Sequence, residues 1–166
     1  MHPEFLSAGL LQLLLLIIVA NGTPIILRDL MHARFDAPLD GGKNFFDGQR
    51  LLGDSKTWRG VIGSILMTAF AAWLIGVPAV TGAGIGVLAM CGDIVASFCK
   101  RRLRLASSSM APLLDQVPES LLPAWVLMPQ FALDEAAVLI LTGLFIVFEL
   151  SASVILYRLG IRKRPY

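Results

Sequence analysis

The sequence has few of the residues that soluble proteins place on their surfaces. Only 16% of its 166 residues are charged, whereas 56% are hydrophobic, and the mean hydropathy is +0.73. A soluble domain of ordinary composition has roughly a quarter of its residues charged. The scarcity of charge excludes a soluble globular domain and predicts an integral membrane protein.

Cysteine and histidine are also scarce. Cys91 and Cys99 are eight residues apart, about 12 Å along a helix, which is too far for a disulfide. We interpret both as small apolar filler residues. The two histidines, His2 and His32, lack metal-ligand spacing, and no serine–histidine pair suggests a hydrolase. Any chemistry must therefore come from carboxylates and cations.

Basic residues are absent from every second break between the apolar segments. The fourteen basic residues form three clusters: Arg28, Arg34, Lys43, Arg50, Lys56 and Arg59; Lys100, Arg101, Arg102 and Arg104; and Arg158, Arg162, Lys163 and Arg164. The remaining polar stretches contain only the acids Glu4, Asp134 and Glu135. The positive-inside rule places the three clusters in the cytoplasm. Five crossings of the cell (inner or plasma) membrane satisfy this pattern, with the N-terminus outside and the C-terminus cytoplasmic.

The predicted fold is an all-α integral membrane protein with one transmembrane domain over residues 1–166. Its spans cover about 5–27, 60–77, 79–98, 119–133 and 136–157, and its cytoplasmic loops cover about 28–59 and 99–118. The fourth span is short and contains two prolines, but the basic clusters on both sides of it and of its neighbour require it to cross.

Two local features refine these spans. The first span is expected to break at Asn21-Gly-Thr-Pro24, because proline removes a backbone donor. This break is either a simple helix end or a place where Asn21 faces a polar cavity. In the third span, Gly82, Gly84 and Gly86 favour close approach of neighbouring helices.

Asp93 is the strongest candidate for a functional residue. An acid inside an apolar span is costly unless it faces a cavity, a metal or a cation. In a helix, Asp93, Ser97 and Lys100 lie on one face, with about 10 Å from carboxylate to ammonium. The topology brings further polar residues to the same membrane face: Asn21, Asp40, Lys43, Asp54, Lys56, Arg59, Arg101, Arg102, Asp115, Gln116 and Glu119.

This set of residues is typical of phosphate chemistry. Carboxylates from separate segments are usual ligands of Mg²⁺, and lysine and arginine offset phosphate charge. Phosphoryl and nucleotidyl transfer need alignment and charge stabilisation above all. Residues 100–104 alone are better explained as a topological anchor or an anionic-lipid patch. Glu149 in the last span either faces the cavity or pairs with a loop arginine.

Several motifs together resemble one family. They are Asn21…Pro24, Pro38-Leu-Asp40, Asp47-Gly48, Gly53-Asp-Ser-Lys-Thr-Trp-Arg-Gly60, Gly92-Asp93-x3-Ser97-Phe-x-Lys-Arg-Arg102 and Leu114-Asp115-Gln116. In this order they resemble the CDP-archaeol synthase family, which is related to the CTP:phosphatidate cytidylyltransferases that make CDP-diacylglycerol. The resemblance covers nearly the full chain. It implies a five-span nucleotidyltransferase that uses Mg²⁺ to transfer CMP from CTP to a lipid phosphate.

The resemblance also implies residue roles. Catalysis falls to Asp93, Lys100 and Asp115, with Asp93 and Asp115 as metal ligands. The substrate-binding residues are Asn21, Lys56, Thr57, Arg59, Ser97, Arg101, Arg102 and Gln116. The acid that the family usually has three residues after Asp115 is replaced by Pro118, and we expect Glu119 to substitute as the further metal ligand.

The expected partners are CTP, a lipid phosphate within the bilayer and the membrane itself, with no nucleic acid; a homo-oligomer is left open. The alternative function is a non-catalytic protein that binds or transports an anionic lipid or a phosphorylated solute. The sequence has no internal repeat of the kind common in transporters. A phosphotransferase using a CDP-alcohol would need several acids on one helix, which the sequence does not contain.

Overall fold

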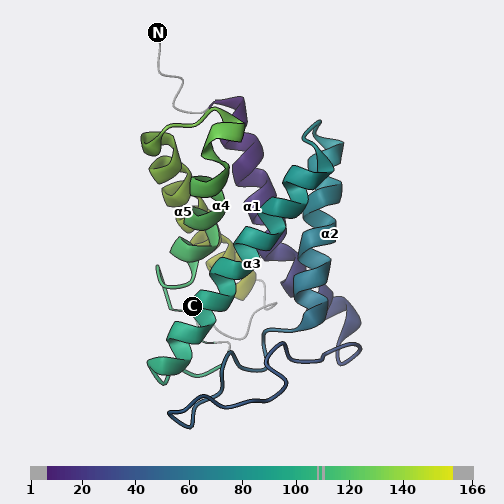
Figure 1. Cartoon of the computed structure of the whole chain (residues 1–166), viewed down its shortest axis with the longest axis vertical. Helices are drawn as coiled ribbons and strands as arrows, with labels where there is room; N and C mark the ends of the chain where they lie inside the picture. Colours follow the sequence, from purple (N-terminus) through teal and green to yellow (C-terminus); the bar gives the residue numbers. More distant parts are fainter. Residues whose placement is uncertain (1–6, 108, 110, 159–166) are drawn as a thin grey trace.

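The computed structural model describes residues 7–107, 109 and 111–158, and its regular structure is helical. The helices are α1 (Ala8–Met31), α2 (Trp58–Leu74), α3 (Ala79–Arg102), α4 (Gln116–Leu127), the 3-10 helix η1 (Met128–Phe131) and α5 (Glu135–Arg158). Within these residues the only β pairing is two isolated bridges. The α-helices run side by side, and the loop between α1 and α2 lies at one end of the bundle (Figure 1). The predicted Glu4 and the tail cations Arg162, Lys163 and Arg164 lie outside the described residues.

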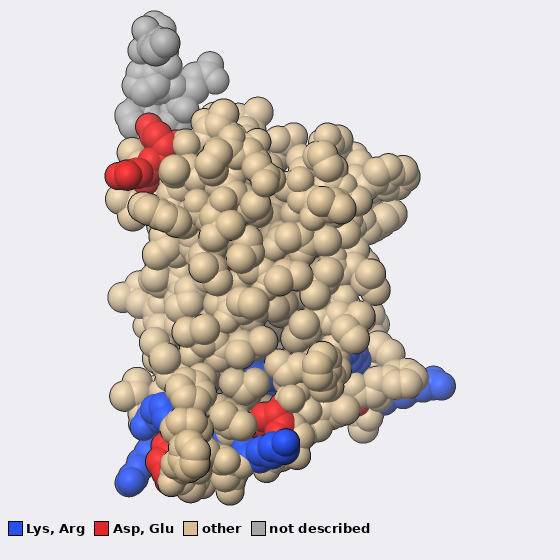
Figure 2. All heavy atoms as spheres, in the orientation of Figure 1, with Lys and Arg blue, Asp and Glu red and all other residues tan. Residues whose placement is uncertain are grey.

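Within the described residues, three helices are long and apolar enough to cross a membrane: α1, α3 and the Glu135–Ile155 part of α5. Helix α2 is apolar but shorter, with 17 residues. On the face drawn in Figure 2, lysine and arginine side chains gather at one end of the molecule, which we call the basic end. A broad uncharged belt separates this end from a small acidic patch at the opposite end. An all-helical membrane protein is therefore confirmed, while the number and orientation of the crossings stay predictions.

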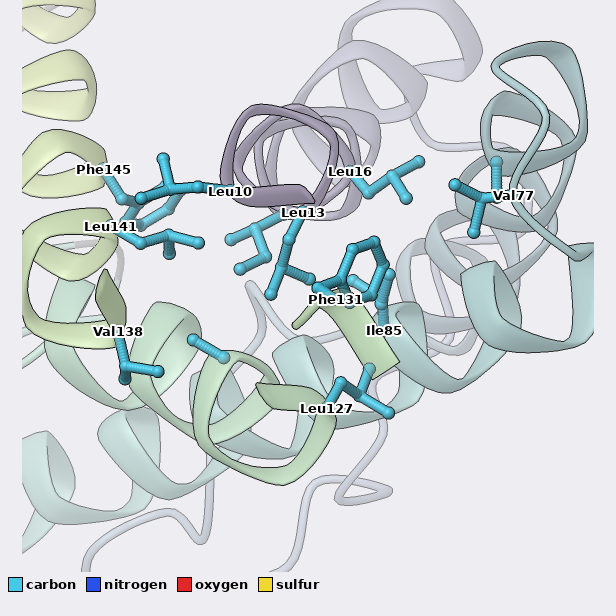
Figure 3. Close-up of a cluster of buried hydrophobic side chains, with 13 residues drawn as sticks. Leu10, Leu13, Leu16, Val77, Ile85, Leu127, Phe131, Val138, Leu141 and Phe145 are labelled. Carbon is cyan, nitrogen blue, oxygen red and sulfur yellow. The ribbon is translucent and has the colours of Figure 1, made fainter. Parts of the chain in front are cut away.

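The apolar core lies away from the basic end and is shared by α1, α4 and α5, with a contribution from α3. Leu10 and Leu13 of α1 and Leu141 and Phe145 of α5 are buried to 1% exposure or less. Ile85 of α3 belongs to the same cluster (Figure 3). In a bilayer this core supplies packing contacts, because apolar surface gains little by moving from lipid into protein.

Small residues bring α3 close to α2, as predicted for two of three glycines. A Cβ atom added at Gly86 would lie 2.9 Å from the Ile65 Cα, and one added at Gly82 would lie 2.6 Å from the Thr68 carbonyl oxygen. No heavy atom lies within 4 Å of a Cβ built at Gly84, so the prediction was wrong there. The close approach fixes α3 against α2 and so fixes the position of its polar end.

The predicted break in the first span was wrong. Helix α1 continues through Pro24 to Met31. Proline at this position cannot donate to the Ala20 carbonyl oxygen, but the buried Ser64 hydroxyl of α2 donates to that oxygen at 2.8 Å. The Asn21 amide donates to the Ile17 carbonyl of the same helix. A neighbouring helix thus replaces the missing backbone bond, and the helix does not end.

Two further boundaries differ from prediction for local reasons. Helix α2 begins at Trp58, two residues early, because the Thr57 hydroxyl caps it by accepting from the Gly60 N–H. Helix α3 extends to Arg102, through residues predicted to begin a loop. Cations in a last turn interact favourably with the helix dipole, which supports this extension.

Candidate active site

An ion pair between Lys56 and Asp93 links α3 to the loop between α1 and α2, which we call the long loop (residues 32–57). The Lys56 ammonium contacts both carboxylate oxygens of Asp93, and the two side chains are only 20% and 15% exposed. Burial alone would lower the pKa of Lys56, but Asp93, with Glu119 and Asp115 nearby, outweighs burial and raises it. Lys56 is therefore a cation at neutral pH and not a general base.

Helix α4 adds a second carboxyl group to this pair. Glu119 is 6% exposed, and its carboxyl group lies within hydrogen-bonding distance of Asp93. Two carboxyl groups this close need a shared proton or a cation between them. Gly92 makes the approach feasible, because a Cβ at that position would collide with the backbone of Pro118 and Glu119. The residue beside Asp93 thus determines how closely α4 presents its acid.

A second buried ion pair lies near the first. Lys100 and Asp115 are 2.7 Å apart, with side chains 8% and 12% exposed. Lys100 also donates to the Ser109 carbonyl, and Asp115 accepts from the Ala111 N–H. These contacts hold the loop before α4 against the end of α3. Ionic contacts from Asp93 and Lys100 thus join α3 to both loops at the basic end.

The carboxylates fit a divalent cation in part. Among the described residues, no three histidine, cysteine, aspartate or glutamate side chains form a metal-binding group. The predicted set of Asp93, Asp115 and Glu119 is therefore not gathered into one ligand group; Asp93 and Glu119 adjoin each other, whereas Asp115 pairs with Lys100. Two carboxylates nevertheless suit Mg²⁺, which usually takes its remaining ligands from water and substrate phosphates. The Asp93–Glu119 pair fits such an ion.

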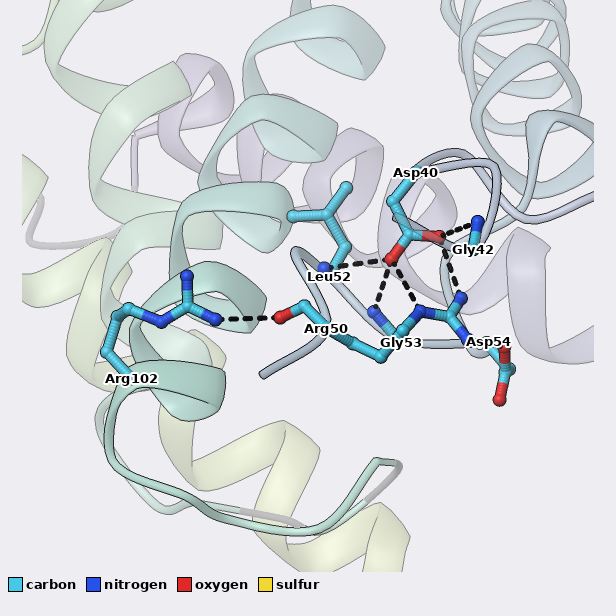
Figure 4. A network of polar contacts seen from close by, with 7 residues as sticks. All are labelled: Asp40, Gly42, Arg50, Leu52, Gly53, Asp54 and Arg102. Carbon is cyan, nitrogen blue, oxygen red and sulfur yellow. Dashed lines mark hydrogen bonds and ion pairs between the residues drawn. The ribbon is translucent and has the colours of Figure 1, made fainter. Parts of the chain in front are cut away.

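Asp40 organises the loop that carries Lys56. Its carboxylate accepts hydrogen bonds from the backbone N–H groups of Gly42, Leu52 and Gly53 and is paired with Arg50 at 2.8 Å (Figure 4). Burial by itself would raise the pKa of Asp40, but the hydrogen bonds from Arg50 and the three amides hold it well below its ordinary value. Asp40 stays ionised at neutral pH, so the loop keeps its central acceptor.

Arg102 fastens the same loop to α3. Its guanidinium donates to the Arg50 carbonyl at 2.8 Å and pairs with Asp47 at 2.9 Å. It also lies over the rings of Phe45 and Phe98, 4.6 and 4.7 Å from their centroids. An arginine held by two aromatic faces and a carboxylate is a rigid anchor. Arg102 therefore serves to position the loop in this structure.

The sequence and fold of this chain match one family throughout. The family described as CarS-like, CDP-archaeol synthase, matches residues 10–84 and 77–166. The chain belongs to the CDP-archaeol synthase family. This membership confirms the predicted resemblance and the prediction that the protein is a nucleotidyltransferase.

Individual relatives agree with the assignment to the CDP-archaeol synthase family. The CDP-archaeol synthase of Methanococcus aeolicus is 31% identical over 162 residues, covering 87% of this chain and 88% of the relative. That of Hyperthermus butylicus is 41% identical over 106 residues, 60% of each protein. A solved structure, described as an intramembrane enzyme for archaeal membrane lipids biosynthesis, matches with a TM-score of 0.72 and 30% identity. It covers 86% of this chain and 91% of that chain.

Three further residues that were predicted to bind substrate are buried near the two ion pairs. Ser97 is buried one turn beyond Asp93 on α3. Gln116 is fully buried at the start of α4, and its amide oxygen accepts from the Leu113 N–H. Arg101 is buried and donates to the Ala106 carbonyl. These three stay candidates for substrate contact around the two ion pairs.

Three others have structural partners. The Asn21 amide and the Thr57 hydroxyl bond to their own local backbone, as described above. Arg59 donates to the carbonyls of His32 and Arg34 and pairs with Asp36. None of these contacts reaches Asp93, so the part of Asn21, Thr57 and Arg59 in substrate binding stays a prediction.

Residue-type reasoning missed the organising role of Asp40 and Asp47. Both occur in the motifs quoted for the CDP-archaeol synthase resemblance. Gly41 and Gly42, which follow Asp40, have positive φ of 56° and 81°. An acid followed by residues that favour turns is a signal for a carboxylate accepting from loop amides. That signal was present in the sequence.

Proposed function

We propose that the protein transfers CMP from CTP to the phosphate of an archaeal ether lipid and releases pyrophosphate. The observation that carries this proposal is the buried cluster of Lys56, Asp93 and Glu119, formed by the long loop, α3 and α4. Relatives covering most of the chain are named CDP-archaeol synthase, which supports the ether lipid as acceptor.

In the proposed reaction an oxygen of the lipid phosphate forms a bond to the α-phosphorus of CTP. The bond from that phosphorus to the oxygen bridging to the β-phosphorus breaks, and pyrophosphate leaves with the electron pair. The protein has to hold the two phosphates in line and to offset the charge that develops. Lys56, Lys100 and Arg101 are the buried or nearly buried cations placed to do this.

Asp93 and Glu119 would hold Mg²⁺, which supplies positive charge to the triphosphate oxygens when it is bound. Lys56 now contacts Asp93, so it has to move its ammonium toward a phosphate when the carboxylate takes a cation. Lys100 is held by Asp115 and Ser109, so it contributes fixed charge. Preorganised charge of this kind lowers the barrier more effectively than mobile charge.

We also propose five crossings with the basic end in the cytoplasm. The basic side chains of the described loops lie at that end (Figure 2), and the positive-inside rule assigns it to the cytoplasmic face. This orientation gives the site access to cytoplasmic CTP. The lipid phosphate would reach the same cluster from the bilayer, because Asp93 lies within a helix long enough to span it.

The test is a reaction of purified protein with CTP, Mg²⁺ and either an ether-linked or an ester-linked lipid phosphate, with CDP-lipid measured by mass spectrometry. We expect product and stoichiometric pyrophosphate, with faster turnover of the ether lipid. A monodisperse, folded preparation that forms no CDP-lipid from either acceptor would refute the proposed activity. Equal turnover of both would remove only the assignment of the acceptor.

A further inference from the structure

The Lys56 ammonium and a divalent cation compete for the same carboxylate. The ammonium contacts both oxygens of Asp93, and Glu119 is close enough to interact with its charge. The side chains of Lys56 and Asp93 are only 20% and 15% exposed, so charges here are poorly screened by water. An ammonium and a divalent ion on the same oxygens repel each other strongly at such short range. The Asp93–Glu119 pair therefore accepts one of these two cations at a time.

Helix packing fixes the two acids, so their backbones do not move to accommodate a second cation. A Cβ added at Gly92, beside Asp93, would lie 2.2 Å from the Pro118 carbonyl oxygen and 2.8 Å from the Glu119 nitrogen. Helix α3 is also held against α2 at Gly86. Backbones packed this closely have no space in which to shift. The group that moves when the carboxylates take a different cation is therefore Lys56.

The backbone of Lys56 is fixed as well, which confines the movement to its side chain. Its N–H donates to the Gly53 carbonyl, and its own carbonyl accepts from the Leu39 N–H at 2.7 Å. The next residue, Thr57, caps α2. A lysine ammonium is carried on a flexible four-carbon stem. Lys56 can therefore release Asp93 without any opening of the long loop.

Releasing Lys56 has different consequences for a metal ion alone and for one that arrives with a triphosphate. A metal ion alone takes Asp93 and leaves the ammonium without a partner, beside a stronger positive charge. Breaking a largely buried ion pair in this way is unfavourable. The triphosphate of CTP carries several negative charges, and its oxygens accept charge-assisted hydrogen bonds from an ammonium. It therefore supplies the partner that a displaced Lys56 needs.

We propose that Lys56 keeps divalent cations off the Asp93–Glu119 pair until the triphosphate of CTP is present, so that metal and nucleotide bind together. This inference rests on the proposed function, because it takes the carboxylate pair as the metal site. By thermodynamic linkage, CTP raises the affinity for the metal by the same factor by which the metal raises the affinity for CTP. Lys56 thus has two partners in turn, Asp93 before CTP binds and a phosphate oxygen afterwards.

The test measures Mn²⁺ binding to the full-length chain in detergent micelles, without lipid acceptor and without nucleotide. Mn²⁺ takes the same oxygen ligands as Mg²⁺, and water-proton relaxation detects it when it is bound to a large, slowly tumbling particle. Lys56→Gln should bind Mn²⁺ at least about tenfold more tightly than the wild type, because the repelling charge is gone. Lys56→Arg keeps the charge and should bind as weakly as the wild type. Lys43→Gln, at an exposed lysine of the same loop, should also match the wild type.

Two comparisons assign the effect to this site. Adding Asp93→Asn to Lys56→Gln should abolish the gain in Mn²⁺ affinity. In the wild type, CTP should raise the signal of protein-bound Mn²⁺, whereas cytidine, which has no phosphate, should not. The wild-type comparison needs no variant, so it decides the question even if Lys56→Gln fails to fold.

The outcomes separate this inference from the proposed reaction. A wild type that binds Mn²⁺ without CTP as tightly as with it, or as tightly as Lys56→Gln does, overturns the role of Lys56 and leaves CDP-lipid formation unaffected. Protein that forms CDP-lipid but binds no Mn²⁺ in any variant, even with CTP, overturns both the role of Lys56 and the carboxylate pair as the metal site. Failure of the proposed function itself is the absence of CDP-lipid in the separate assay.

Discussion

The long loop is predicted to depend on Asp40 for its order. Asp40→Ala removes the acceptor for three backbone N–H groups and for Arg50. Its side chain has no exposed surface in the structure, so water does not replace these bonds without rearrangement. Hydrogen bonds to a charged group contribute about 1.5–3 kcal/mol each and do not add fully. Taking about 3 kcal/mol for local opening, the amides of the loop should exchange about 100-fold faster.

The assay is hydrogen–deuterium exchange of the Gly42, Leu52 and Gly53 amides, read in peptides that cover residues 40–53. The matched control is Asp54→Asn, because Asp54 also pairs with Arg50 but is 78% exposed. An exposed pair contributes at most about 1 kcal/mol, so exchange should rise less than about fivefold. If Asp40→Ala leaves the exchange of these amides unchanged, or if Asp54→Asn matches it, the loop does not depend on the buried carboxylate.

Acidification provides an independent check of the same carboxylate. The folded pKa of Asp40 is lowered from its ordinary 3.8, so its contribution to stability is fully present above about pH 4. The contribution is lost as the pH falls further toward the folded pKa. Protection of the loop amides, corrected for intrinsic exchange, should therefore be constant from pH 7 to about 4.5. A loss of protection near pH 6 would contradict the assignment.

Three further substitutions test the site around Lys56, Asp93 and Glu119 by enzyme kinetics. Asp93→Asn should lower kcat by at least about 100-fold, while Asp134→Asn at the acidic end should retain activity; equal rates would remove Asp93 from the site. Gly92→Val should separate α3 from α4 and abolish CDP-lipid formation. Gly84→Val should be tolerated, because a Cβ added at Gly84 meets no heavy atom of another part of the chain within 4 Å. Arg102→Lys keeps the charge but loses the planar contacts with two aromatic rings, so the KM for CTP should rise more than kcat falls.

The fold was predictable where composition and charge placement decide it. Long apolar segments with basic clusters at alternate breaks allow few arrangements, and the observed helices occupy each predicted span. Boundaries were less predictable because local partners set them. The start of α2 depends on the Thr57 cap, and the continuity of α1 depends on Ser64, forty residues further along the chain. No local pattern around Pro24 indicates that a hydroxyl group of another helix will donate the hydrogen bond that proline cannot donate.

The site was predictable as a set of residues but not as a set of pairs. Apolar surroundings single out Asp93 without any structure, because an isolated charge there is too costly. Which cation neutralises it depends on how the loop folds back, and the sequence offers Lys56, Lys100 and Arg101 equally. The adjacent Lys100, Arg101 and Arg102 contact three different partners in the structure, namely Asp115, Ala106 and the 47–50 turn. Successive residues of a helix point in different directions, so a run of like charges need not share a target.

The resemblance implies an acid at the position of Pro118, and packing brings the next residue, Glu119, to Asp93 instead. Moving an acid by one position on a helix rotates it by about 100°, which by itself would turn it away from Asp93. Here α4 approaches so closely that a Cβ at Gly92 would meet the Pro118 backbone, and at this contact the neighbouring Glu119 faces Asp93 with its longer side chain. The extra methylene of glutamate and the missing side chain of glycine together maintain the carboxyl pair. Glu119→Asp should therefore impair activity more than its preserved charge suggests, since the shorter side chain no longer reaches across the gap.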